Sequence, residues 1–160
     1  MSKDKNFTVT MFIWLALLGS VFMYILIAFI MKDKTDFLTG RELTNTKYEI
    51  LLGIFAFISL ISGTLSILAR KNILKEKFYK KMIKTPSAQS VYLITIIFSL
   101  ALAETITILG LVLFFMTLKF KIFLVFAFVS ISLILLNKPN LEEFTNFKTN
   151  FNKENIEDSL

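Results

Sequence analysis

Four long apolar runs limit what this chain can fold into. They cover residues 7–31, 48–69, 91–118 and 120–136 of 160. At about 1.5 Å per helical residue, the first three exceed the roughly 30 Å hydrocarbon core of a bilayer, and the fourth is short. Because 55% of all residues are hydrophobic, a soluble domain of this length could not bury them. The sequence therefore predicts an all-α integral membrane protein, one antiparallel bundle of four transmembrane helices without a separate soluble domain.

The basic residues predict the orientation of this bundle. Twelve lie in the N-terminal tail, the second connection and the C-terminal tail, which share one side of a four-span protein. Six lie in the first and third connections. Since cytoplasmic segments carry an excess of Lys and Arg, both termini are predicted in the cytoplasm. We expect the first run to be an uncleaved helix, and the protein to lie in a bacterial cytoplasmic (inner) membrane.

Residue types that are missing from the chain narrow the chemistry. It has no Cys and no His, which removes thiolate nucleophiles, disulfides and the commonest metal ligands and general base. It also has no glycine-rich phosphate loop and no nucleophile elbow. The net charge of +6 fits topology and contact with anionic lipid better than nucleic acid. We therefore expect no enzyme activity, no cofactor and no metal site.

The connection at 71–84 has the pattern of a basic amphipathic helix. Leu74, Phe78 and Met82 recur every four residues, and lysines cover much of the remaining surface. Such a segment is suited to lie on an anionic leaflet, so membrane lipids are the predicted partner. The alternative is that it extends the preceding helix or caps the bundle. The lysines are Lys71, Lys75, Lys77, Lys80, Lys81 and Lys84.

The polar C-terminal tail, residues 138–160, contains a second helical pattern. Asn140 and Glu143 resemble a capping box, with Pro139 directly before it. Apolar residues then recur at helical spacing, which predicts a short interfacial helix. These residues are Leu141, Phe144, Phe147 and Phe151.

Small residues predict which helices approach most closely. In lipid, helices associate through close packing, and small side chains allow it. The run at 48–69 carries a stripe of them, and the run at 91–118 carries others around its centre. We therefore expect these two helices to pack as an antiparallel hairpin. The predicted packing residues are Gly53, Ser59, Ser62, Gly63, Ser66 and Gly110.

Glu104 is the one charged residue within the run at 91–118, and it lies near the middle of that run. A carboxylate at this depth costs roughly 2.5–3.5 kcal/mol on insertion scales and usually faces protein or water. Burial favours its protonated form. We predict a proton-binding site formed by Glu104, Thr105 and Thr107, with hydroxyls of the preceding span, Ser59 and Ser62, as further hydrogen-bond partners. The alternative is a static hydrogen bond that joins two helices.

The segment around Glu104 resembles the ion-binding helix of rotary ATPase proteolipid (c) subunits. The match is Ala101-x-Ala103-Glu104-Thr105-x-x-Ile108-x-Gly110-Leu111-Val112. In that family the carboxylate helix leaves a hairpin whose incoming helix is rich in small residues, and the carboxyl binds a proton or sodium. Thr105 matches the hydroxyl residue of the sodium-binding members. The incoming helix here has no Gln to complete a sodium site, so the resemblance implies a proton.

Two hypotheses follow for the function. In the first, the chain is a small proteolipid-like membrane subunit that binds or passes protons through Glu104 within a homo-oligomer or a larger membrane complex. In the second, it is a non-transporting assembly or scaffold protein, and Glu104 is a structural bond between helices.

Overall fold

A computed structural model describes residues 5–32, 45–73 and 87–157 of the chain. Five helices lie within these ranges. They are α1 (Lys5–Met31), α2 (Asn45–Ile73), α4 (Ala88–Thr117), α5 (Phe120–Leu136) and α6 (Leu141–Glu157). The all-helical fold predicted from the sequence is confirmed. Most of the amphipathic segment predicted at 71–84 lies outside the described residues; α2 continues to Ile73, and Lys71 on its last turn is exposed.

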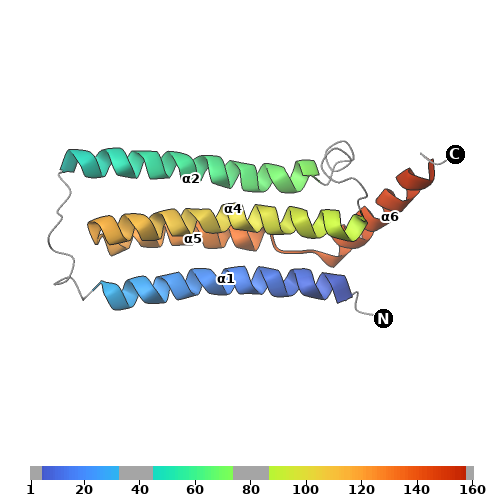
Figure 1. The fold of residues 1–160 in the computed structure, drawn as a ribbon, viewed down its shortest axis with the longest axis horizontal. Coiled ribbons are helices and arrows are strands. Elements are labelled where there is room, and N and C mark those ends of the chain that lie inside the picture. Colours follow the sequence, from blue (N-terminus) through green and yellow to red (C-terminus); the bar gives the residue numbers. More distant parts are fainter. Residues whose placement is uncertain (1–4, 33–44, 74–86, 158–160) are drawn as a thin grey trace.

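Helix α4 is the centre of the bundle. It packs against α2, α5 and α1, and Figure 1 shows α1 and α2 on opposite sides of the α4–α5 pair. Helix α1 begins at the end of the bundle where α6 lies (Figure 1), and we call this the α6 end. Helix α2 runs antiparallel to α4, with Ser66 near its end donating to the Ser99 carbonyl oxygen near the start of α4.

Local sequence determines how α4 begins and how it turns into α5. Ser87 is the N-cap, and its hydroxyl accepts a hydrogen bond from the Ser90 N–H at 3.2 Å. At the other end Leu118 adopts a left-handed conformation (φ 54°), and its N–H donates to the Phe114 carbonyl oxygen. This residue reverses the chain within a very short turn, which brings α5 back along α4.

Two glycines lie where helices pack against each other, and they differ in how much space they leave. A Cβ on Gly110 would lie 2.5 Å from Cβ of Phe126, so α4 and α5 could not approach as they do with any larger residue there. A Cβ on Gly63 would lie 3.4 Å from Leu133 and 3.8 Å from Ile106, which is ordinary contact. Gly110 is thus the tighter constraint on the bundle.

The outward faces of α1 and α2 are apolar and exposed. Phe12 on α1 is 67% exposed, and Leu60 on α2 is 71% exposed. Three helical stretches, Phe7–Met31, Thr46–Lys71 and Ala88–Thr117, are long and apolar enough to cross a membrane. A fourth span is obtained if α5 and α6, bent by 54° at the break between them, count as one. By composition, the chain is a multi-pass helical membrane protein.

Aromatic and basic side chains lie together at the end of the bundle opposite α6. The Lys119 ammonium is 3.5 Å from the ring centroid of Tyr48, and that of Lys32 is 4.0 Å from the ring of Phe29. Such pairs are typical of the membrane–water interface. Along α2 the distance from Tyr48 to Arg70 is about 33 Å at the helical rise, which matches a hydrocarbon core.

Helix α6 turns its aromatic residues toward the bundle. The Phe144 ring lies 5.1 Å from the Tyr92 ring and 6.1 Å from the Phe7 ring, between centroids. Phe151 packs with Ala88 and Val91 at the start of α4. Phe144 and Phe151 are therefore buried in protein, whereas Leu141 is 47% exposed. The helical part of the tail prediction is confirmed, but these two rings contact helices rather than the lipid interface.

Candidate functional site

Glu104 is held at the contact between α4 and α1. The Ser20 hydroxyl is hydrogen-bonded to its Oε1 atom, and the Tyr24 hydroxyl donates to the same oxygen at 3.1 Å. Ser20 and Tyr24 are four residues apart on α1, so they lie on one face of that helix. Glu104 itself is partly buried. The site thus places one carboxyl and two hydroxyls together within the transmembrane part of the bundle.

The number of hydrogens in this group is chemically informative. Ser20 Oγ also lies 2.7 Å from the Leu17 carbonyl oxygen, which can only accept. There are therefore three short contacts, and Ser20 and Tyr24 contribute one hydroxyl hydrogen each. All three contacts can have a hydrogen of their own only when Glu104 carries a proton and donates it to Ser20. The geometry accommodates a protonated carboxyl.

The hydroxyls that the sequence suggested as partners of Glu104 lie elsewhere. Thr105 donates to the Ala101 carbonyl oxygen of its own helix. Thr107 is buried, and its hydroxyl has no partner among the described residues. Ser59 and Ser62 are on α2, which contacts the face of α4 that carries Ser99 and Ile106. Glu104 lies about 200° around α4 from Ile106, so it faces α1 instead.

Some of the small residues of α2 are buried against other helices, and others lie on the exposed surface of the bundle. Ser62, Gly63 and Ser66 are buried. At Gly53 a Cβ would meet no described atom within 4 Å, so this residue takes no part in close packing. The reason is its angular position, about 80° around the helix from Gly63.

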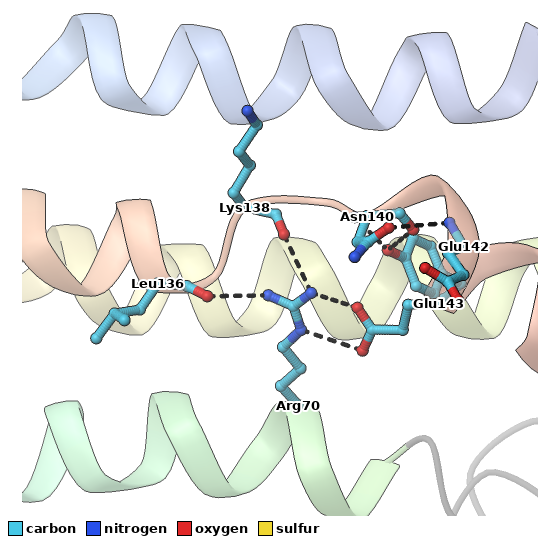
Figure 2. A network of polar contacts seen from close by, with 7 residues as sticks. Arg70, Leu136, Lys138, Asn140, Glu142 and Glu143 are labelled. Atoms are coloured by element: carbon cyan, nitrogen blue, oxygen red, sulfur yellow. Dashed lines mark hydrogen bonds and ion pairs between the residues drawn. The ribbon is translucent and has the colours of Figure 1, made fainter.

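A second polar group, the Arg70 cluster, joins α2, α5 and α6 at the α6 end (Figure 2). Arg70 forms an ion pair with Glu143 in the first turn of α6. It also donates to two backbone carbonyl oxygens just beyond and at the end of α5, those of Lys138 at 3.1 Å and Leu136 at 3.3 Å. Arg70 and Glu143 are 16% and 32% exposed, so the pair is partly buried.

The Arg70 cluster completes the C-terminal end of α5, where helix carbonyls lose their usual partners. Leu136 accepts from Arg70, and Leu133 accepts from the side chain and the N–H of Asn137. The Ile134 carbonyl oxygen accepts from the Trp14 indole N–H at 2.9 Å. The Leu135 carbonyl oxygen accepts from the Lys138 N–H. With each of the last four carbonyls bonded, α5 can end after 17 residues within a membrane protein.

The start of α6 is capped in a different way from the capping box predicted from Asn140 and Glu143. The Asn140 side chain does accept from the Glu142 N–H at 2.9 Å. The Glu143 carboxylate, however, pairs with Arg70 instead of bonding back to the Asn140 N–H. That N–H donates to the Tyr92 hydroxyl at 3.3 Å, which links α6 to α4.

Comparisons with other proteins give no family for the chain. No family model matches it, and neither a curated protein nor a solved structure is significantly similar. In the described part of the chain, no group of three or more Asp, Glu, His or Cys residues could hold a metal ion. The candidate sites therefore depend on geometry alone.

The sequence analysis missed Ser20 and Tyr24. A signal was present: they are polar residues four apart in the apolar run at 7–31, and the sequence alone places them on one helix face. What it does not give is the rotation of that face toward α4. That rotation is a property of the packed bundle.

Proposed function

We propose that this chain is a small membrane subunit that binds or passes a proton at Glu104. One observation carries the proposal. Three hydrogen-bonding contacts join Glu104, Ser20, Tyr24 and the Leu17 carbonyl, and each has its own hydrogen atom only when the carboxyl is protonated. The resemblance of Ala101–Val112 to a proteolipid helix supports the same chemistry. Assembly into a homo-oligomer or a larger membrane complex is part of this proposal, and it rests on that resemblance.

The electrostatic surroundings of Glu104 support a proton as the bound species. On α1, α2, α4 and α5 the described Lys and Arg side chains lie near the helix ends, and no ion pair with Glu104 is found among the described residues. A carboxylate without a cation in such surroundings is costly, and a proton removes the charge. The hydroxyls of Ser20 and Tyr24 can bond to the carboxyl in either form, so the site tolerates proton exchange.

A scaffold function is the second candidate, and one observation favours it. Both hydroxyls bonded to Glu104 come from α1, so the same hydrogen bonds fasten α1 to α4. Helix α1 is also fastened to α5 by the Trp14 bond to the Ile134 carbonyl oxygen. In this alternative Glu104 is a permanently protonated clamp.

Labelling with a hydrophobic carbodiimide, which reacts with protonated carboxyls from within the membrane, separates the two candidates. We expect Glu104 to be labelled more at low pH than at high pH, and Glu104→Gln to abolish the labelling while the protein still folds. Glu143 is the internal control, because it is partly exposed and paired with Arg70. If the labelling of Glu104 does not change with pH and Glu104→Gln changes only thermal stability, the scaffold function is correct.

We also propose that the α6 end faces the cytoplasm of a bacterial inner membrane. The twelve-to-six distribution of basic residues supports this orientation. Anionic lipid at that leaflet is the proposed partner of Lys71 and of the lysines at 75, 77, 80, 81 and 84. Single cysteines at Lys148 and Lys119 test the orientation with an impermeant thiol reagent on intact cells. Labelling at Lys119 and not at Lys148 is expected, and the reverse would overturn the orientation.

A further inference from the structure

Several hydroxyls on these helices are bonded to the carbonyl oxygen four residues earlier. Thr95, Thr105 and Ser132 all do this, at 2.7 to 2.9 Å. A hydroxyl bonded in this way needs no further partner, whatever surrounds it. A buried hydroxyl without such a bond needs a partner from elsewhere.

Ser99 and Thr107 lack this bond to the preceding helical turn. Both are fully buried, and neither hydroxyl has a partner among the described residues; the same holds for the buried Ser59 hydroxyl. For Thr107 the usual acceptor is occupied, because the Ala103 carbonyl oxygen already accepts from Ser130 in addition to the helix N–H. Buried polar groups of this kind are normally satisfied by ordered water.

These hydroxyls lie in a row along α4 that begins at the Arg70 cluster. Asn137, next to the Leu136 carbonyl that Arg70 binds, donates to Ser66, and Ser66 donates to the Ser99 carbonyl oxygen. From Ser99 the row continues past the Ser130–Ala103 bond to Thr107. The steps along α4, four residues each, are about 6 Å, a distance that one or two waters bridge.

The row ends beside Glu104. Thr107 is three residues after Glu104, and side chains at this spacing are neighbours on a helix surface. At its other end the row meets Arg70 and Glu143, which are partly exposed at the α6 end. Polar groups therefore extend from the α6 end to the level of the carboxyl, through the part of the bundle where α2, α4 and α5 meet.

We propose that the row formed by Asn137, Ser66, Ser99, Ser130 and Thr107 binds internal water and gives Glu104 its proton access from the α6 end. The link to Glu104 rests on the proposed function. The binding of water by the row does not, because it follows from the unpartnered hydroxyls alone.

Silver ions test the row, because they reach a thiol inside a membrane protein only through water. The chain has no cysteine, so single replacements report one position each. Ser99→Cys and Thr107→Cys place a thiol in the row. Thr64→Cys is the matched control, since Thr64 is two residues from Ser66 on the same helix but is exposed on the outer, lipid-facing surface. Silver bonds to sulfur and releases the thiol proton, which blocks later maleimide labelling in denaturing detergent.

We expect silver added at the α6 side of reconstituted vesicles to block Ser99→Cys and Thr107→Cys at least an order of magnitude faster than Thr64→Cys. If both react no faster than the control, or only from the opposite side, the proposal is wrong.

A variant that fails to fold is replaced by Thr107→Val, which keeps the shape of the side chain. Loss of a bound water lowers its melting temperature, whereas an unchanged or raised melting temperature means a dry hydroxyl and contradicts the proposal. Carbodiimide labelling of Glu104 in the unmodified chain judges proton binding separately.

Discussion

The Arg70 cluster and the Glu104 site are both polar groups inside an apolar bundle, but they are satisfied to different degrees. Arg70, Glu143 and the last carbonyls of α5 all have partners. Around Glu104 there are more contacts than hydroxyl hydrogens, and Thr107 nearby has no partner among the described residues. A fully satisfied network holds one arrangement in place. A network that lacks a hydrogen or a partner can accept a proton or a water. The Arg70 cluster is therefore structural, whereas the Glu104 site is the proposed functional one.

The largest effect is expected when the satisfied region is broken. Arg70→Ala leaves the Leu136 and Lys138 carbonyls and the Glu143 carboxylate without their partner, which should lower the free energy of unfolding by about 2–4 kcal/mol. Denaturation in detergent micelles measures the loss. Lys71→Ala is the control, because Lys71 is the exposed neighbour, and it should stay within about 0.5 kcal/mol. Equal effects of the two substitutions would contradict the capping role of Arg70.

The next effect concerns the packing that supports both regions. Gly110→Ala puts a methyl group 2.5 Å from Cβ of Phe126, a position fixed by the backbone of α5. The two helices must separate, at an expected cost of about 1–3 kcal/mol in unfolding free energy. Gly53→Ala is the matched control, since it meets no described atom within 4 Å and should be neutral or slightly stabilising. If the two glycine substitutions have the same effect, the close approach of α4 and α5 is not required.

The smallest effect is expected at the Glu104 site itself. Tyr24→Phe removes one hydrogen bond to the carboxyl and should cost about 0.5–1 kcal/mol, as is typical between transmembrane helices. A double-mutant cycle with Glu104→Leu, which cannot accept the hydrogen bond, measures the coupling of the two side chains. A coupling of zero would show that Tyr24 does not hold Glu104.

Much of the fold could be predicted from apolar periodicity and length alone. The run at 120–136 coincides with α5, and the tail pattern after Asn140 coincides with α6. The partners of the last α5 carbonyls could not be predicted in the same way. Trp14 and Arg70 are distant in sequence and reach these carbonyls only in the packed bundle.

The candidate site was predictable only in its central residue. A carboxyl in an apolar run is conspicuous in any sequence, so Glu104 was found. Its partners follow from the rotation of each helix, and a stripe of small residues on α2 suggested the wrong neighbour for it. Helix α2 does pack on α4, but on the face that carries Ser99 rather than Glu104. Choosing between α1 and α2 required the three-dimensional arrangement.

The protonation state of Glu104 tests the central claim most directly. Infrared difference spectra between samples of the reconstituted protein at different pH report the carbonyl stretch of a protonated carboxyl. We predict a carboxylic acid band whose intensity depends on pH and which is absent from Glu104→Gln, while the helical amide bands are unchanged. If no carboxylic acid band depends on Glu104, or if that band persists at every pH at which the protein stays folded, Glu104 does not exchange a proton and the proposed function is wrong.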